Sequence, residues 1–208
     1  MKLKKKTRFY VGLVYTGLIW STLAIVIIVP VVAALWSPLL AWRDPVYIVA
    51  GLAGIIAIVL LFVQPLLAGG YLPNLNRLQS RRIHRVIGGI LVMMVVIHII
   101  GLWTTSPPDV IDALLFASPT AFSFWGVIAM WALFASALTA LLRRRLRINP
   151  RMWRFIHTGF AVVIVPSSVI HAFLIIGTME VISKRLLCGF IITITAKVII
   201  DWWRLPKR

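Results

Sequence analysis

Apolar residues fill six long blocks of the chain, which short polar connections separate. Each block reaches about 20 residues, the length of helix that crosses the hydrocarbon core of a bilayer. Only helices satisfy every backbone hydrogen-bonding group within one such segment. The pattern therefore predicts an all-α fold, a six-transmembrane-helix bundle forming a single integral membrane domain over residues 1–208. The expected spans are residues 10–36, 46–68, 84–103, 119–142, 153–176 and 183–203.

Three of these blocks begin with a helix-start signal. Asp44, Ser118 and Asn149 each place a capping side chain directly before a proline, which suits the first position of a helix. Residues 109–116 are expected to form a short interfacial helix between the third and fourth spans. The first block follows a basic N-terminus, as in a signal peptide, but it exceeds the about 7–15 apolar residues of a signal sequence. We expect it to be retained as the first span.

Composition agrees with a membrane protein and argues against nucleic-acid binding. The 208 residues are 61% hydrophobic and 13% charged, whereas a soluble domain averages about 45–50% and about 25%. A net charge of +17 can attract phosphate groups. The basic residues nevertheless lie in short connections between apolar blocks, which is how membrane topology is encoded. We therefore expect no nucleic-acid partner, and we expect the protein to contact membrane lipid.

The distribution of Lys and Arg predicts the orientation of the spans. Most gather at the two termini and in the second and fourth connections with their flanks. They are Lys2, Lys4, Lys5, Lys6, Arg8, Arg77, Arg81, Arg82, Arg85, Arg143, Arg144, Arg145, Arg147, Arg151, Arg154, Arg204, Lys207 and Arg208. The other connections carry only Arg43, Lys184 and Arg185, and Lys197 lies in the sixth block, where it can pair with Asp201 one turn on. This positive-inside pattern predicts cytoplasmic termini, and we expect a bacterial inner (plasma) membrane.

The four histidines of the chain all lie in the expected spans, in two pairs of equal spacing. His84 and His98 are 14 residues apart on the third span, and His157 and His171 are 14 apart on the fifth. Fourteen residues of helix rise about 21 Å and return the second side chain to within about 40° of the first. Both spans run from the cytoplasm outward, so His84 should lie level with His157, and His98 with His171.

This geometry favours haem b, two per chain, bound between the third and fifth spans. Two imidazoles saturate a haem iron for electron transfer rather than oxygen binding. A structural or proton-relay role for the histidines is the alternative. A non-haem metal is disfavoured because no carboxylate or thiol accompanies either pair and because ligands about 21 Å apart cannot share an ion. Covalently attached haem is excluded, since Cys188 is the only cysteine.

Four arginines are expected at the cytoplasmic level of His84 and His157. Haem propionates are anions with which guanidinium groups can pair. The other interpretation is that these arginines only set the topology and face lipid headgroups. The candidates are Arg81, Arg82, Arg85 and Arg154.

Two segments carry a resemblance to a known family. Residues 81–88, with the sequence RRIHRVIG, lead to His98, and residues 153–157, with the sequence WRFIH, lead to His171. Both look like the ferric reductase-like transmembrane domain, whose hallmarks are His-Arg-x-x-Gly on the third helix and Trp-x-x-x-His on the fifth, each with a second histidine about four turns on. That family includes ferric reductases, the NADPH oxidase membrane core, and the haem subunit of a periplasmic methionine sulfoxide reductase system. The resemblance covers roughly residues 46–203.

The resemblance implies electron transfer across the membrane through an inner haem (His84, His157) and an outer haem (His98, His171). Ferric reductases and NADPH oxidases add a cytoplasmic module that binds flavin and nicotinamide. The present sequence contains neither a G-x-G-x-x-G motif nor a flavin-binding stretch. We therefore expect an oxidoreductase subunit that cannot oxidise NAD(P)H itself. Electrons would come from a separate cytoplasmic flavoprotein or from quinol and pass to an external acceptor such as ferric iron.

Other functions stay open at this point. A haem-binding subunit that delivers electrons to a periplasmic reductase of the methionine sulfoxide reductase type fits the short, single-domain form. A quinol-oxidising cytochrome b shares the 14-residue spacing but uses its second and fourth helices. A transporter or assembly factor with incidental histidines is the non-redox alternative.

Overall fold

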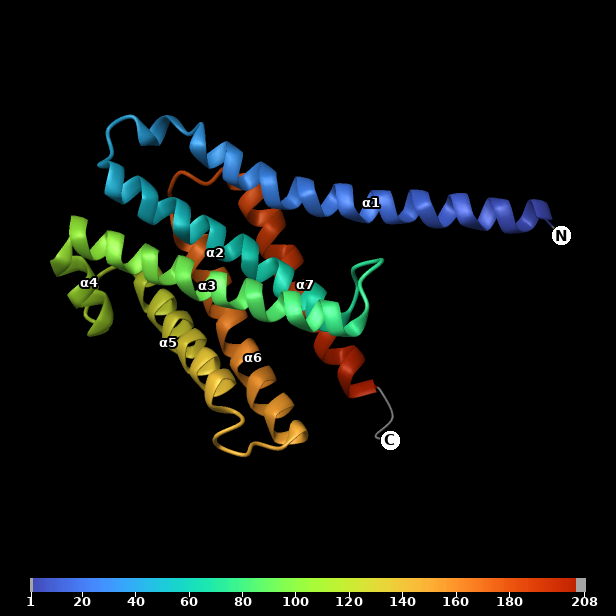
Figure 1. Ribbon diagram of the computed structural model, residues 1–208. Helices are drawn as coiled ribbons and strands as arrows, with labels where there is room; N and C mark the ends of the chain where they lie inside the picture. Colours follow the sequence, from blue (N-terminus) through green and yellow to red (C-terminus); the bar gives the residue numbers. More distant parts are fainter. Residues whose placement is uncertain (1, 205–208) are drawn as a thin grey trace.

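The computed structural model describes the backbone of residues 2–204 and the side chains of residues 10 and 12–204, and within these ranges it is all-helical. Figure 1 labels the helices in chain order. They are α1 (Lys2–Leu35), the 3₁₀ turn η1 (Pro38–Leu40), α2 (Pro45–Gly69), α3 (Arg77–Thr105), α4 (Pro107–Leu114), α5 (Ala121–Leu142), α6 (Pro150–Leu174) and α7 (Val181–Arg204).

Six of these helices are long and apolar enough to cross a membrane, in agreement with the six predicted spans. The protein is thus an integral membrane protein. The expected interfacial helix corresponds to α4, which begins two residues earlier than predicted. The largest difference is at α3, which begins at Arg77 rather than near His84 because Asn76 and Gln79 form a capping box. Each of their side chains accepts a hydrogen bond from the other residue's backbone N–H, so the polar first turns are helical as well.

Two of the three predicted helix starts are confirmed and one is wrong. The Asp44 carboxylate accepts from the backbone N–H of Val46 at 2.7 Å, and the Asn149 carbonyl oxygen accepts from that of Met152 at 2.8 Å. Ser118 does not cap α5, which begins at Ala121. Its hydroxyl is 2.9 Å from that of Thr120 instead, so the chain makes a hydroxyl-linked turn before the helix.

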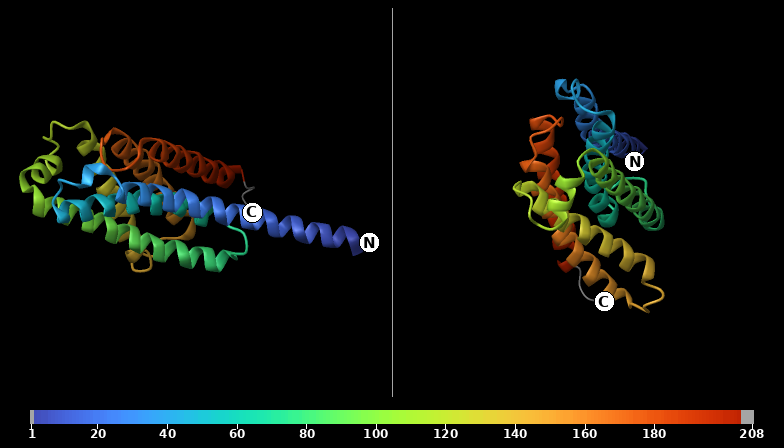
Figure 2. Two further views of the ribbon diagram at one scale, coloured as in Figure 1. Left: turned by 90° about the horizontal axis from the view of Figure 1, so that it is seen from above. Right: turned by 90° about the vertical axis from the view of Figure 1, so that its left-hand side faces the viewer.

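The helices form two antiparallel hairpins, α2–α3 and α5–α6, with α7 packed against both (Figures 1 and 2). Helix α1 lies along α2 and α7, and its N-terminal half extends beyond the other helices. One end of the bundle carries the α2–α3 and α5–α6 turns and the last turn of α7. We call it the basic end, and the opposite end the far end.

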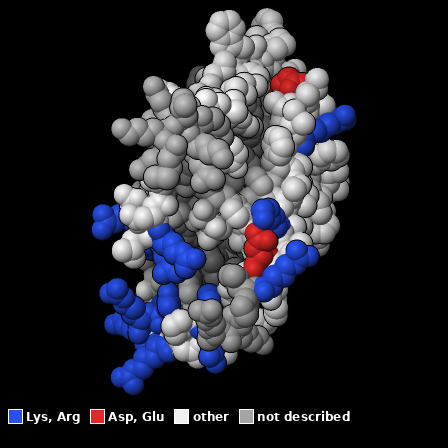
Figure 3. Space-filling view, turned by 90° about the vertical axis from the view of Figure 1, so that its right-hand side faces the viewer, with Lys and Arg blue, Asp and Glu red and all other residues white. Residues whose placement is uncertain are grey.

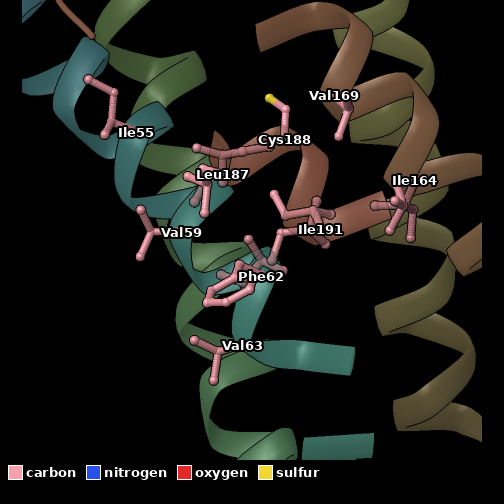
Figure 4. Close-up of a cluster of buried hydrophobic side chains, with 14 of the residues drawn as sticks. Ile55, Val59, Phe62, Val63, Ile164, Val169, Leu187, Cys188 and Ile191 are labelled. Atoms are coloured by element: carbon pink, nitrogen blue, oxygen red, sulfur yellow. The ribbon is translucent and has the colours of Figure 1, made fainter. Parts of the chain in front are cut away.

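The interior is built where α7 lies between the two hairpins. Figure 4 shows Leu187, Cys188 and Ile191 of α7 between α2 and α6, close to Phe62 and Ile164. All five side chains are buried. Lipid tails are as apolar as these residues, so close packing rather than escape from water holds them together. Cys188 is therefore a core residue.

Charge is unevenly distributed between the two ends. Figure 3 shows the basic end, where Lys and Arg atoms gather over the lower part of the face. There the Lys197 Nζ lies 2.6 Å from the Asp201 carboxylate, which confirms the predicted pair. Several basic residues used to predict the topology lie outside the described side chains. They are Lys2, Lys4, Lys5, Lys6, Arg8, Lys207 and Arg208.

Candidate functional site

The structure brings the four histidines together in two facing pairs, one from each hairpin. The imidazoles of His84 (α3) and His157 (α6) lie 6.0 Å apart between ring centroids, with planes at 77°. Those of His98 and His171 lie 6.5 Å apart at 80°. His84 lies level with His157, and His98 with His171, as the sequence predicts. We call His84 and His157 the basic-end pair, and His98 and His171 the far-end pair.

These separations match two imidazoles on opposite sides of one metal ion. Metal–imidazole bonds of about 2 Å hold two opposed nitrogens about 4 Å apart. Adding the short distance from each nitrogen to its own ring centre gives about 6 Å between centroids. Aromatic rings in ordinary edge-to-face contact also lie about 4.5–7 Å apart between centroids. The spacing therefore admits a metal ion between the rings of each pair without requiring one.

Helix α2 orients the two histidines of α3 through backbone carbonyls. The Nδ1 of His98 lies 2.7 Å from the carbonyl oxygen of Ala50, and the Nδ1 of His84 lies 3.3 Å from that of Gln64. A carbonyl oxygen can only accept, so Nδ1 carries the proton in both rings. The unprotonated Nε2 of each ring is then left as the metal ligand.

Helix α5 orients the two histidines of α6 in the same way. The Nδ1 of His171 lies 2.8 Å from the carbonyl oxygen of Phe122. At the basic end, the Nδ1 of His157 lies 3.1 Å from the hydroxyl of Ser136. His157 is thus the one histidine whose Nδ1 partner is a side chain.

Together these contacts reveal a structural repeat that the sequence does not display. The acceptors on α2, Ala50 and Gln64, are 14 residues apart, and so are Phe122 and Ser136 on α5. Each hairpin therefore carries two acceptors on its first helix and two histidines at matching spacing on its second. Two similar hairpins facing each other offer equivalent ligands from both sides, as a flat macrocycle between them requires.

The repeat extends to two glycines at the far-end pair. A Cβ at Gly54, one turn beyond Ala50, would lie 3.0 Å from the Nδ1 of His98. A Cβ at Gly126, one turn beyond Phe122, would lie 2.6 Å from the Nδ1 of His171. Real Cβ atoms essentially never make a contact as short as the one at Gly126, and the one at Gly54 is tighter than nearly all Cβ contacts, so a side chain at either position would press on the histidine ring.

The donor set at each level fits haem better than a metal held by protein alone. Among the described residues, no three His, Cys, Asp or Glu side chains gather as a metal-binding group. Two opposed imidazoles leave the equatorial positions of an ion open, and a tetrapyrrole supplies four nitrogens there. Gln64 adds an orphaned polar group near the basic-end pair. Its amide nitrogen and oxygen are both buried without a hydrogen-bond partner, and a Cβ on Gly88 would lie 3.5 Å from that nitrogen.

The surroundings of His157 include an aromatic stack. The Trp153 ring lies one turn before His157, with centroids 4.9 Å apart and planes at 22°. The Arg143 guanidinium lies 5.2 Å from the Trp153 ring. The sequence suggests only a membrane-interface or packing role for Trp153, whereas the structure packs it directly on a histidine of the basic-end pair.

The four arginines proposed for haem propionates are all exposed. The Arg154 guanidinium lies 5.4 Å from the Trp202 ring, and the Arg85 Nε donates to the Arg81 carbonyl at 3.4 Å. The contacts recorded for Arg154 and Arg85 are thus with other groups of the chain. A propionate-binding role for Arg81, Arg82, Arg85 and Arg154 stays a prediction.

Comparison with known proteins gives one match. The family described as "Ferric reductase like transmembrane component" matches residues 53–167, more than half of the chain. The matched segment includes both histidines of α3 and His157, and it ends four residues before His171. Neither a curated protein nor a solved structure matches the chain.

Proposed function

Because this chain belongs to the ferric reductase-like transmembrane family, we propose that it is a transmembrane electron-transfer subunit with two b-type haems. His84 and His157 hold the inner haem, and His98 and His171 hold the outer haem. One observation carries the proposal: four imidazoles form two facing pairs, each ring with its Nδ1 engaged by the neighbouring helix.

The residues of this chain do three things in the proposed mechanism. Each imidazole would offer its Nε2 lone pair to a haem iron, and a hydrogen bond from its Nδ1–H would fix the tautomer and the ring orientation. Two imidazoles for each iron would favour electron transfer over oxygen binding. Rigid helices hold the two levels about 21 Å apart, the rise of 14 helical residues. Haem bound at each level would supply a one-electron carrier on each side of the membrane.

Charge sets the direction in which the subunit works. On the positive-inside rule, we infer that the basic end, and with it the His84–His157 level, faces the cytoplasm of a bacterium. His84 and His157 would then hold the haem that receives electrons, and His98 and His171 the haem that passes them on at the external side. We propose a separate flavoprotein or membrane quinol as donor and an external acceptor such as ferric iron.

Electron transfer across a sealed vesicle tests this function. Proteoliposomes with the purified chain, trapped dithionite and external ferricyanide should bleach ferricyanide much faster than vesicles without protein. His98→Ala should reduce that rate to the protein-free level, because one ligand of the outer haem is gone. Met93→Ala, at an exposed site on the same helix, is the matched control and should keep the wild-type rate. The proposal would be refuted if His98→Ala bleached ferricyanide at the wild-type rate, or if the unaltered chain, loaded with haem, did not bleach it faster than protein-free vesicles.

A further inference from the structure

An apolar groove opens on the surface of the bundle between α1, α2 and α7. It holds about 340 Å³ and is lined by Leu18 of α1, Phe62 and Leu66 of α2, and Phe190 and Ile194 of α7. Ligand pockets start at about 300 Å³ and are mostly apolar. The groove lies along three membrane-spanning helices, so a lipid-soluble molecule would enter it from the bilayer.

Tyr71, which also lines the groove, carries polar chemistry at the basic end. Its hydroxyl donates to the Asp201 carboxylate at 2.6 Å, and the Lys197 Nζ donates to the same oxygen at 2.6 Å. Gly70 ends α2 in the left-handed conformation at φ 66°, and the Tyr71 ring folds back on Gly69, where a Cβ would lie 2.7 Å away. Burial, and next the hydrogen bond to Asp201, raise the pKa of Tyr71, so the phenol stays a proton donor.

The side chains of Tyr71, Lys197 and Asp201 form a polar cluster at the end of the groove. Their chemistry favours one kind of occupant over an ordinary lipid chain. Ionisable side chains in membrane helices are costly and mark functional sites by default. A Lys–Asp pair alone can be a snorkelling surface pair, but here the carboxylate also binds a groove-lining phenol. The Lys197 ammonium, which could attract a phosphate, is already paired with Asp201 and does not line the groove. Tyr71 does line it, and its phenol oxygen can accept a hydrogen bond from a hydroxyl group on an apolar ring. An apolar tail with a ring that carries hydroxyl groups is the chemistry of a membrane quinol.

The groove is one helix away from the basic-end histidine pair. Phe62 and Leu66 line the groove, and between them Gln64 offers its carbonyl oxygen to the Nδ1 of His84. Helix α2 therefore separates a molecule in the groove from a ligand of the inner haem. A helix with its side chains is about 10–12 Å across, so donor and haem ligand are close neighbours.

We propose that this groove binds a membrane quinol and that Tyr71, which lines the groove, relays one quinol proton to Asp201 as the electrons pass to the inner haem. The proposal rests on the proposed function and names the donor. Two quinol O–H bonds break and two ring C=O bonds form. One proton passes from the quinol O–H to the phenol oxygen of Tyr71 while the phenol proton moves to the Asp201 carboxylate, and the other goes to water at the basic end. The two electrons leave one at a time toward the level of His84 and His157, where a bound haem would take up the first and pass it outward before it takes up the second.

Bound quinone tests the groove independently of haem. The full chain is purified from membranes, extracted with solvent, and its quinone is quantified per chain. We expect about one quinone per chain in the wild type, one for this groove. Ile194→Trp, which fills the groove, should lose it. Ile192→Trp, exposed on the same helix and outside the groove, should keep it. Equal quinone in both variants, or none in the wild type, would overturn the proposal.

Rates of haem reduction test the proton acceptors. Decyl-ubiquinol should reduce the haem of the nanodisc-embedded chain, and Asp201→Asn should slow this about tenfold or more, since a general base contributes about 10²–10⁴. Tyr71→Phe leaves packing unchanged but removes the relay to Asp201, so it should slow the reduction to a similar extent. Dithionite should reduce both variants as it does the wild type, which shows that the haems are intact. A wild-type rate in Asp201→Asn, or reduction by reduced flavin but never by decyl-ubiquinol, would contradict a quinol site. Absent haem would refute the proposed function instead and leave the quinone assay to decide on the groove.

Discussion

At the scale of single residues, the neighbours of each histidine set its orientation, and most of them have no signal in the sequence. Ala50, Gln64 and Phe122 act through backbone carbonyls, which every residue has. The four histidines could be predicted because their side chains are rare in spans and their spacing is regular. Their acceptors could have been sought only by asking which positions on the preceding helix share the 14-residue spacing.

The space that Gly126 leaves for His171 gives the first prediction. In Gly126→Ala the new Cβ would meet the Nδ1 of His171 at 2.6 Å, so the ring must move away from the far-end pair. The outer haem should be lost and the inner haem kept, so that haem content falls from two per chain to one. Gly159→Ala, where a Cβ meets nothing within 4 Å, is the control and should keep both. Pyridine haemochrome analysis measures the content, and two haems in Gly126→Ala would disprove the packing argument.

Ser136 gives a prediction at the basic-end pair. If His157 binds iron through Nε2, its Nδ1–H donates to the Ser136 hydroxyl 3.1 Å away. Ser136→Ala removes that acceptor, which makes the imidazole a less basic ligand and leaves a buried donor unsatisfied. The inner haem should become easier to reduce, with a more positive midpoint potential, and should bind about 10–100-fold more weakly. The outer haem should not change. A spectroelectrochemical titration reads both potentials separately.

Thr139→Ala is the matched control for this experiment. Thr139 lies one turn further along α5 and donates its hydroxyl to the Ala135 carbonyl of its own helix. Its replacement should leave both potentials unchanged. An inner-haem potential in Ser136→Ala that equals the wild type would show that the hydroxyl does not tune the ligand.

At the scale of elements, periodicity and start signals predict the helices well, and the errors have local causes. All six spans are found, because 20 apolar residues in a row admit few other structures. Hydrophobic periodicity does not predict the start of α3, because residues 77–83 are mostly polar, although the capping box at Asn76 and Gln79 is visible in the sequence. Ser118 resembles a cap because Ser-Pro suits a helix start as well as a turn; in the structure its hydroxyl contacts that of Thr120, which in turn contacts that of Ser123.

The confirmed and the rejected helix start can be compared directly. Asn149→Ala removes the cap of α6 and should lower the free energy of unfolding by about 1 kcal/mol. Ser118→Ala removes no cap and should cost less than half of that. Unfolding of the detergent-solubilised protein, followed by circular dichroism as SDS is titrated, measures both. The opposite ranking would mean that the turn before α5 is worth more than the α6 cap.

At the scale of the whole molecule, two similar hairpins, a packing helix and a one-sided charge distribution combine into a directional device. The repeat of α2–α3 in α5–α6 was not predicted, because it consists of hydrogen-bond acceptors and spacings rather than similar side chains. The two histidine pairs thus lie at two levels of a bundle whose basic end differs from its far end. On the proposed function, orientation in the membrane decides which level would receive electrons.

Cysteine labelling in intact cells tests this orientation. In a Cys188→Ala background, Ile176→Cys places a thiol at a fully exposed far-end position, and Leu146→Cys places one in the exposed α5–α6 turn. A membrane-impermeant maleimide should label Ile176→Cys in intact cells and Leu146→Cys only after the cells are lysed. The reverse pattern would place the basic end outside and reverse the proposed direction of electron flow.

The central claim is that the two histidine pairs hold two haems. The most direct test is an absorption spectrum of the purified full chain, oxidised and dithionite-reduced, with haem quantified per chain, for the wild type and His98→Ala. The account predicts two b-type haems in the wild type and one reducible haem in the variant, because His84 and His157 form an independent site. No haem in the wild type, or the same haem content in both proteins, would contradict it.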